Sequence, residues 1–307
     1  MGLFPTKILL ATDGSEDAKL AAKTAIDLST KLGSELHVIY VAPDHHYVHA
    51  YYDLRHKEEE EQFRREDRRA LDEYVDHVRE AGGTITEAHL RVGDAAKEIV
   101  ELAEELNVGL VVVGSRGHGP IRRALLGSVS TRVVGHAHCS VLIVRSYGGA
   151  QEPGNLPGKL LVAIDGSKEA SAAARVATEI AKTTSSELHV VYALQEERYR
   201  PHLGPEMWEG WEAGFEQAKR HARSWVEEQA ERMRGEGAKT AEAHLMLGRP
   251  DAAIVLLADE LGAGLVVVGS RGLGGIRRVL VGSVSDSVVQ HAPCPVMVVR
   301  PEKDQTV

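Results

Sequence analysis

Two glycine-rich segments carry the residues whose types and spacing could do chemistry. Each segment follows an apolar Leu-Val-Val-Val run, and they span Leu110–Ser130 and Leu265–Ser285. Both have the spacing Gly-x2-Gly-x9-Gly-Ser, formed by Gly114, Gly117, Gly127 and Ser128 and by Gly269, Gly272, Gly282 and Ser283. A strand that ends in glycines and leads into a helix presents backbone N–H groups to an anion. The two segments therefore predict a phosphate-binding loop that occurs twice.

Backbone N–H groups would have to supply most of the affinity of such a loop. One helix N-terminus contributes about 0.3–1 kcal/mol, whereas holding a millimolar ligand requires about 4 kcal/mol. Several charge-assisted hydrogen bonds of about 1.5–3 kcal/mol each would suffice. In the first copy the donors would be Gly127, Ser128, Val129 and Ser130. The loops contain neither the Gly-Lys-Ser/Thr of a Walker A motif nor GxGxxG, which excludes the P-loop mechanism on its motif.

Simpler interpretations of these residues stay open. The glycines could serve only to turn the chain, and Ser128 could serve only as a helix cap. The loop arginines would either meet phosphate oxygens or lie solvated; they are Arg116, Arg122, Arg123, Arg271, Arg277 and Arg278. GSRG, IRR and GSVS recur letter for letter in both copies. This repetition favours a shared constraint, which packing alone would also produce.

The chain is an internal duplication. KILLATDGSEDA at 7–18 matches KLLVAIDGSKEA at 159–170, and EAHLRVGDAA at 87–96 matches EAHLMLGRPD at 242–251. A chain of 307 residues fits about two domains of about 150 residues. The Gly-, Pro- and Asn-containing segment between the copies is typical of a linker. We predict a first domain at 1–146, a linker at 147–158 and a second domain at 159–307.

Apolar runs alternate with helix-like segments within each copy. In the first copy we expect strands at 7–12, 36–42, 84–91, 110–113 and 141–144, and helices at 16–32, 58–81, 95–106 and 129–136. This alternation predicts an α/β domain with a parallel sheet covered on both faces. Ligands of such sheets bind beyond the carboxyl ends of the strands, where the strand order reverses. That point would lie between the first and third strands or between the first and fourth.

Asp13-Gly14-Ser15 follows the first expected strand, and the first glycine loop follows the fourth. If these two strands are adjacent, Asp13 and the loop share one crevice. The simpler interpretation of Asp13-Gly14-Ser15 is a turn followed by a helix N-cap.

In this combination of motifs the chain resembles the universal stress protein family in its tandem two-domain form. The glycine motif after Leu-Val-Val-Val, together with the early Asp-Gly-Ser, carries the resemblance, which covers nearly all of both halves. It implies two repeats of a five-stranded, flavodoxin-like three-layer α/β/α domain of the adenine nucleotide α-hydrolase-like (HUP) class. It further implies that each competent domain binds ATP, together with Mg²⁺.

The resemblance also implies roles for individual residues. Asp13 and Asp165 would reach the ribose or a bound Mg²⁺. Val41 would lie beside the adenine through its backbone, and Ala193 is its counterpart in the second copy. The other predicted ATP-binding residues are Gly114, Arg116, Gly117, Gly127, Ser128, Val129, Ser130, Gly269, Arg271, Gly272, Gly282, Ser283, Val284 and Ser285. The fifth strands, at 140–146 and 295–301, would pair the halves into an internal pseudo-dimer, and a further homodimer stays open.

The expected function is an ATP-binding regulator or sensor in a stress response. No nucleophile–base pair and no obvious general base accompany the loops, so a dedicated enzyme is not expected, although slow ATP hydrolysis stays open. Two alternatives remain: an ATPase or adenylate-transferring enzyme of the same fold class, and a nucleotide-free assembly module.

The composition limits which partners the protein is expected to bind and in which cellular compartment it is expected to work. The chain has 45 acidic and 36 basic side chains and a net charge of −9, which argues against nucleic acid or an anionic membrane as a partner. No apolar run reaches the ~18–20 residues of a membrane span. Two cysteines, Cys139 and Cys294, fit a reducing compartment, and we expect a cytoplasmic protein.

Three further groups of residues have mainly structural interpretations. The histidines His45, His46, His49 and His56 lack ligands at a recognised spacing, so a metal site is not favoured there. Aromatic residues gather on one face of an expected helix in the second copy, as core or as a partner surface; they are Trp208, Trp211, Phe215 and Trp225. His136 and Cys139 match His291 and Cys294, and packing at a helix end is expected for them.

Overall fold

The chain forms two compact units that repeat one architecture, Met1–Leu156 and Pro157–Val307. The computed structural model describes residues 6–44, 57–117, 126–145, 158–196, 208–273 and 281–301. Four of the loop arginines and the four histidines at 45–56 lie outside the described residues; they are Arg122, Arg123, Arg277, Arg278, His45, His46, His49 and His56.

Strands and helices alternate through both units. The first unit consists of β1 (Lys7–Thr12), α1 (Glu16–Leu32), β2 (Glu35–Ala42), α3 (Lys57–Glu80), β3 (Glu87–Val92), α4 (Ala95–Glu105), β4 (Leu110–Gly114), α5 (Ser128–His136) and β5 (Ser140–Val144). The second consists of β6 (Lys159–Ala163), α6 (Lys168–Thr184), β7 (Glu187–Leu194), α7 (Trp208–Gly235), β8 (Ala241–Leu247), α8 (Pro250–Leu261), β9 (Leu265–Gly269), α9 (Ser283–His291) and β10 (Val296–Val299). The expected elements are present, and the third strand begins at Glu87 rather than at residue 84.

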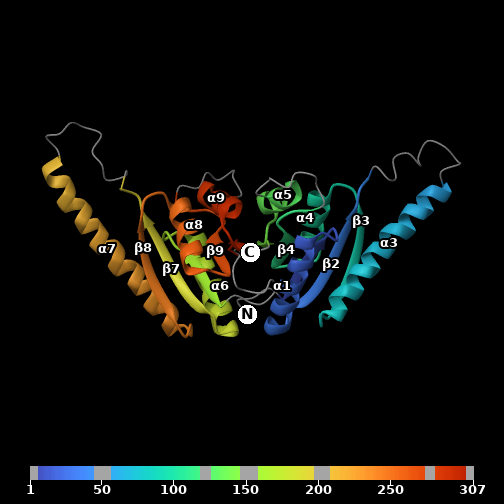
Figure 1. Cartoon of the computed structure of the whole chain (residues 1–307), viewed down its shortest axis with the longest axis horizontal. Coiled ribbons are helices and arrows are strands. Elements are labelled where there is room, and N and C mark those ends of the chain that lie inside the picture. Colours follow the sequence, from blue (N-terminus) through green and yellow to red (C-terminus); the bar gives the residue numbers. More distant parts are fainter. Residues whose placement is uncertain are drawn as a thin grey trace, which may run out of the picture. The chain divides into compact units, whose positions relative to one another are not determined.

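Each unit is built on a five-stranded parallel sheet between two layers of helices. The strand order is β3-β2-β1-β4-β5 in the first unit and β8-β7-β6-β9-β10 in the second, and all pairs within each unit are parallel. In the first unit α1 and α3 cover one face of the sheet, and α4 and α5 cover the other (Figure 1). The α/β fold with a three-layer arrangement is thus confirmed for both halves. Of the two places predicted for the reversal of strand order, the structure has the one between β1 and β4.

The first helix of each unit begins after a serine that caps its N-terminus. Ser15 caps α1, since its hydroxyl accepts a hydrogen bond from the Ala18 N–H, and Gly33 ends the helix at a φ of 65°. A glycine adopts this left-handed conformation without a Cβ penalty. Ser167 caps α6 in the same way. The turn-and-cap interpretation of Asp13-Gly14-Ser15 is therefore correct as far as Ser15 is concerned.

The core of each unit lies on both faces of its sheet. The central strands are apolar and fully covered, as a parallel sheet between two helix layers requires; their residues with no exposed surface include Ile8, Leu9, Leu10, Val111, Val112, Leu160, Leu161, Val266 and Val267. Alanines on α1 and α6 pack closely against these strands. A rigid frame therefore carries the loops at its carboxyl edge.

The tryptophan helix α7 turns aromatic side chains toward the sheet. Phe215 is buried in a cluster with Leu194 and Ala222, and Trp211 packs against this cluster. Trp225 lies edge-on to Tyr192, with ring centroids 5.1 Å apart. These side chains form core, as one of the two interpretations predicted; the side chain of Trp208 lies outside the described residues.

Residues near the fifth strands also have structural roles. His136 and His291 each place Nδ1 at 2.7 Å from a carbonyl oxygen one turn earlier in their helices. Cys294 is buried, Cys139 is half-buried, and neither forms a disulfide.

In the part of the chain that the structure describes, no helix is both long and apolar enough to cross a membrane. The predicted pairing of the two halves through β5 and β10 stays a prediction.

Candidate functional site

The carboxyl ends of β1 and β4 bring Asp13 and the first glycine loop together. β1 pairs directly with β4. The Ser15 hydroxyl donates to the Arg116 carbonyl over 3.2 Å, and a Cβ placed on Gly117 would lie 2.2 Å from Asp13 Oδ2. The Ser15 N–H donates to Asp13 Oδ1 over 3.0 Å, which fixes the carboxylate above the strand. The strand-end region that the sequence predicted as a crevice therefore brings Asp13 and the loop together in the first unit.

The second unit repeats this crevice at the ends of β6 and β9. The Ser167 N–H donates to Asp165 Oδ1 over 2.9 Å, and a Cβ on Gly272 would lie 2.5 Å from Asp165 Oδ2. Here the loop also binds the aspartate directly, because the Leu273 N–H donates to Asp165 Oδ2 over 3.1 Å. Asp13 and Asp165 are the carboxylates that the sequence predicted for a magnesium ion or the ribose, and each lies against the glycine loop of its own unit.

The first glycines of the two motifs serve the fold. A Cβ on Gly114 would lie 2.8 Å from the backbone carbon of Asp17, and one on Gly269 would lie 2.6 Å from that of Glu169. Both distances are far below a normal carbon–carbon contact, so only glycine lets the strand end pack against the first helix. The absence of a side chain at these two positions is explained without a ligand.

The third glycines are different. A Cβ on Gly282 would meet nothing closer than 3.4 Å, and its φ of −75° suits any residue. A Cβ on Gly127 would lie 3.2 Å from the Ser115 carbonyl oxygen, a tight contact, at a φ of −72°. Among the described residues, neither backbone strain nor a severe clash requires glycine at 282.

The start of α5 offers fewer phosphate donors than the sequence suggested. Gly127, not Ser128, is the N-cap, and no side chain among the described residues caps the helix. Ser128 as a helix cap is wrong, because Ser128 is already the first helical residue. The Gly127 N–H donates to the Ser115 carbonyl over 2.7 Å, and the buried Ser130 hydroxyl donates to the Gly114 carbonyl over 2.7 Å. These two groups close the loop onto β4 and are not left for a ligand.

The donors that remain are the first-turn N–H groups of Ser128, Val129 and Ser130. Such groups have no partner within their own helix. The second unit is equivalent: Gly282 N–H donates to Ser270 over 2.7 Å, and the Ser285 hydroxyl donates to Gly269 over 2.6 Å. Its first-turn N–H groups are those of Ser283, Val284 and Ser285. Each unit thus presents three N–H groups and a positive helix end to its crevice.

An arginine stands beside each crevice, held by a carboxylate of the first helix. Arg116 Nε lies 3.2 Å from Asp17 Oδ2, and the same oxygen accepts a 2.6 Å hydrogen bond from the Ser115 hydroxyl. Arg271 Nη2 lies 2.9 Å from Glu169 Oε1. The anchoring residues Asp17, Ser115 and Glu169 were not predicted from the sequence. The only signal for them was a serine after Leu-Val-Val-Val-Gly and an acid near the start of the first helix in both copies.

The predicted adenine positions lie level with the aspartates. Thr12 pairs with Tyr40 in the β1–β2 register, so Val41 follows at the level of Asp13. Ala163 pairs with Val191, which places Ala193 at the level of Asp165. Both residues are half-buried and stand next to the last residue of their strands. The backbone at these positions is therefore within the same strand-end region as the loops.

Buried Tyr74 supports the start of the first helix. Its hydroxyl donates to the Ala18 carbonyl over 2.9 Å and ties α3 to the start of α1. Burial raises the pKa of Tyr74 to about 12, so the hydroxyl keeps its proton and stays a donor at neutral pH. Tyr74 supports the helix that carries Asp17, and Asp17 in turn holds Arg116.

Comparison with known proteins agrees with this architecture. The model of the Universal stress protein family matches residues 5–145 and 158–300. A universal stress protein of Mycolicibacterium smegmatis is 32% identical over 227 residues, which cover 74% of this chain and 73% of that protein. The crystal structure of a universal stress protein from Archaeoglobus fulgidus is 25% identical, with a TM-score of 0.70, and covers 99% of this chain and 100% of that one. A Pseudomonas aeruginosa protein described as functionally unknown shares the fold, with 20% identity, a TM-score of 0.67 and coverage of 98% and 94%.

Proposed function

Because the chain belongs to the universal stress protein family, we propose that each of its two units binds ATP with Mg²⁺ at the carboxyl ends of β1 and β4 or of β6 and β9. Occupancy of these sites would be the signal of a regulator or sensor in a stress response. The chain would bind nucleotide rather than turn it over as a dedicated enzyme.

One observation carries this proposal. In both units the helix after the glycine loop begins at a glycine that no side chain caps. Its first turn leaves three N–H groups that have no intrahelical partner. Three charge-assisted hydrogen bonds of about 1.5–3 kcal/mol each exceed the roughly 4 kcal/mol that millimolar binding requires. An anionic triphosphate supplies the acceptors that these groups lack.

The surrounding residues suit the remaining parts of the nucleotide. Arg116 and Arg271 would add a cation beside the phosphates, since each is partly exposed at the loop. Asp13 and Asp165 would hold the ribose hydroxyls or the magnesium ion through carboxylate oxygens. The backbone of Val41 and Ala193 would face the adenine. Magnesium would neutralise phosphate charge, and these carboxylates would orient it.

The test is isothermal titration calorimetry of the full chain with MgATP. Wild-type protein should bind two ATP molecules, the Gly282→Val variant one, and a Gly127→Val, Gly282→Val double variant none. Gly282→Val is the sharper single change, because a Cβ there is accommodated by the protein itself. Gly135→Val is the matched control, since a Cβ at Gly135 meets nothing within 4 Å, and it should bind two.

Mass spectrometry of gently purified protein gives an independent check, with ATP expected to travel with the chain. Full binding by the double variant would overturn the loop as the phosphate site. Absence of copurified ATP together with no calorimetric binding would favour a nucleotide-free assembly module. Multiple turnover with a defined product would favour an enzyme.

A further inference from the structure

A second set of side chains, histidines and glutamates that can bind a metal ion, lies on the two outer strands of each sheet, toward their amino-terminal ends and away from the glycine loops. The sequence Glu-x-His occurs on two neighbouring strands of the first unit, as Glu35 and His37 on β2 and as Glu87 and His89 on β3. Alternate residues of a strand share one face. His37 pairs with Glu87 in the parallel register, so all four side chains stand on the same face.

The second unit repeats this arrangement residue for residue. Glu187 and His189 lie on β7, and Glu242 and His244 lie on β8. His189 pairs with Glu242, as His37 does with Glu87. All of these residues belong to the amino-terminal halves of their strands, whereas the nucleotide crevices lie at the carboxyl ends. The two kinds of site are therefore separate.

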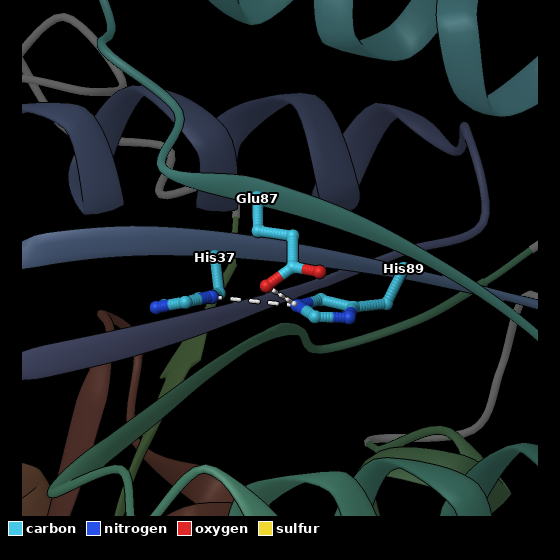
Figure 2. A group of neighbouring side chains, drawn as sticks. All are labelled: His37, Glu87 and His89. Atoms are coloured by element: carbon cyan, nitrogen blue, oxygen red, sulfur yellow. Dashed lines mark hydrogen bonds and ion pairs between the residues drawn. The ribbon is translucent and has the colours of Figure 1, made fainter.

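The ring nitrogens converge in both units. His37 Nδ1 lies 3.3 Å from His89 Nε2, and His89 Nε2 lies 3.8 Å from Glu87 Oε2. Figure 2 shows the Glu87 carboxylate turned toward the His89 ring, with the edge of the His37 ring facing the same point. The three ligand atoms lie within 4.8 Å of one another, as do those of His189, Glu242 and His244.

The nitrogen–nitrogen distance in the first unit matches a tetrahedral zinc ion, and that in the second unit is somewhat shorter. Zinc–nitrogen bonds of about 2.0–2.1 Å at a tetrahedral angle place two imidazole nitrogens about 3.3–3.4 Å apart. The observed nitrogen–nitrogen distances are 3.3 Å between His37 and His89 and 3.0 Å between His189 and His244. Two imidazoles and one carboxylate are a ligand set that zinc uses with a water molecule as the fourth ligand. A pair of histidines in a simple hydrogen bond would not require the carboxylate.

A carboxylate also lies behind the buried histidine of each group. His37 is 3% exposed, and its other nitrogen, Nε2, lies 3.4 Å from Glu35 Oε2. His189 is also 3% exposed. Its Nε2 is buried without a hydrogen-bond partner among the described residues, and Glu187 Oε2 lies 3.9 Å away. A carboxylate behind a ligating histidine is the usual outer arrangement of zinc sites, because it fixes the tautomer that leaves Nδ1 for the metal.

We propose that each unit holds a zinc-class divalent cation between its two Glu-x-His pairs. In the first unit His37 Nδ1, His89 Nε2 and the Glu87 carboxylate are the ligands, and Glu35 orients His37. In the second unit His189, His244 and Glu242 are the ligands, and Glu187 orients His189. The sites join neighbouring strands at the edge of each sheet and are independent of nucleotide.

The test uses zinc and, as a spectroscopic probe, cobalt(II) with the metal-free full chain. Wild-type protein should bind two zinc ions per chain, and bound cobalt should show the visible absorption of tetrahedral coordination. The double variant His89→Asn, His244→Asn should lose both ions and the absorption; these half-buried residues are preferred to buried His37 and His189. Glu87→Gln should weaken one site more than tenfold, and Glu80→Gln, an exposed carboxylate on α3, should change nothing.

Two results would overturn the proposal. One is zinc that binds the double variant as tightly as wild type, which would place it elsewhere, for example on His45, His46, His49 and His56. The other is wild-type protein that takes up cobalt without the tetrahedral spectrum, which would leave the histidines as hydrogen-bonded pairs. Circular dichroism of each variant separates lost metal from lost fold.

Discussion

The two units place the same arginine at the same crevice by different means. In the first unit Asp17 is buried and accepts hydrogen bonds from both the Ser115 hydroxyl and Arg116. In the second unit the carboxylate comes from Glu169, one methylene longer, which reaches Arg271 at 2.9 Å. Asp17 and Glu169 differ in length by one methylene, yet each forms an ion pair with the arginine of its own unit. The position of the guanidinium, rather than the identity of its anchor, is what the two crevices have in common.

The helices that cover the outer strands differ far more. The first unit uses a charged helix, α3, whose Tyr74 donates to the backbone of α1. The second unit uses α7, with Trp211 and Phe215 stacked 5.5 Å apart. The glycine loops and the Glu-x-His pairs nevertheless coincide between the units. The sheet and its two edges are thus shared, whereas the covering layer has been repacked around different side chains.

The largest expected effect concerns the glycines that serve the fold. Gly269→Ala should destabilise the protein by about 3 kcal/mol, at the upper end for overpacking, because the new Cβ meets the α6 backbone, which no rotamer change relieves. Gly114→Ala should cost somewhat less, since its closest contact is 2.8 Å rather than 2.6 Å. Urea unfolding followed by circular dichroism measures both.

The control for this comparison is Gly135→Ala in α5, where the Cβ is unobstructed. It should leave the stability unchanged or raise it by up to about 1 kcal/mol, because alanine favours a helix more than glycine does. Equal stability of all three variants would show that the strand ends are less closely packed against the first helices than described.

A smaller effect on stability should distinguish Asp17 from Glu169, the carboxylates that hold the two arginines. Asp17→Asn removes a buried charge that accepts two hydrogen bonds and should destabilise the protein by about 1–2 kcal/mol. Glu169→Gln should cost less, since Glu169 has one arginine contact and a more exposed side chain. Both variants should weaken MgATP binding in their own unit only, as measured by calorimetry. Loss of binding in the opposite unit would contradict separate anchors.

The sequence predicted the strands and helices, and the meeting of the Asp13 turn with the glycine loop, because these features follow from local patterns. Apolar runs, the Ser15 cap and the glycine spacing are read along the chain, and parallel strands put their ends at one edge. The sequence could not show that the Gly127 N–H and the Ser130 hydroxyl are consumed inside the loop. That depends on how the loop closes onto β4, which no spacing records.

The Glu-x-His pairs were visible in both copies and were still missed. Each pair is unremarkable alone, since an alternating strand at a sheet edge often carries polar residues. The two pairs form one group of possible metal ligands only if β2 and β3 are neighbours and His37 stands opposite Glu87 rather than one residue away. A shift of one residue would turn one pair to the other face of the sheet. The register, which comes from the fold, therefore decides whether four residues form one group.

The smallest effect is a difference in acid sensitivity at these histidines. Burial lowers the pKa of His89 in the first unit, and it lowers the pKa of His189 and His244 in the second. The titratable and charged groups around them are Glu87, His37, Arg91 and Glu105 for His89, and Glu242, Lys159 and Glu187 for His189. Those around His244 are His189 and Glu242. A histidine whose pKa is lower in the folded state takes up its proton first in the unfolded state.

Stability from these groups is therefore complete well above pH 6.5, the ordinary histidine value, and declines as the pH falls below it. Metal-free protein with His244→Asn should lose less stability between pH 7 and pH 5 than wild type, measured as the shift of the urea midpoint. His89→Asn should also reduce the pH dependence, because burial lowers the pKa of His89 as well. Added zinc should raise the midpoint at pH 7 and lose this effect toward pH 5, since protons and the metal compete for the same nitrogens. An identical pH profile for wild type and both variants would show that the histidines titrate alike in the folded and unfolded chains.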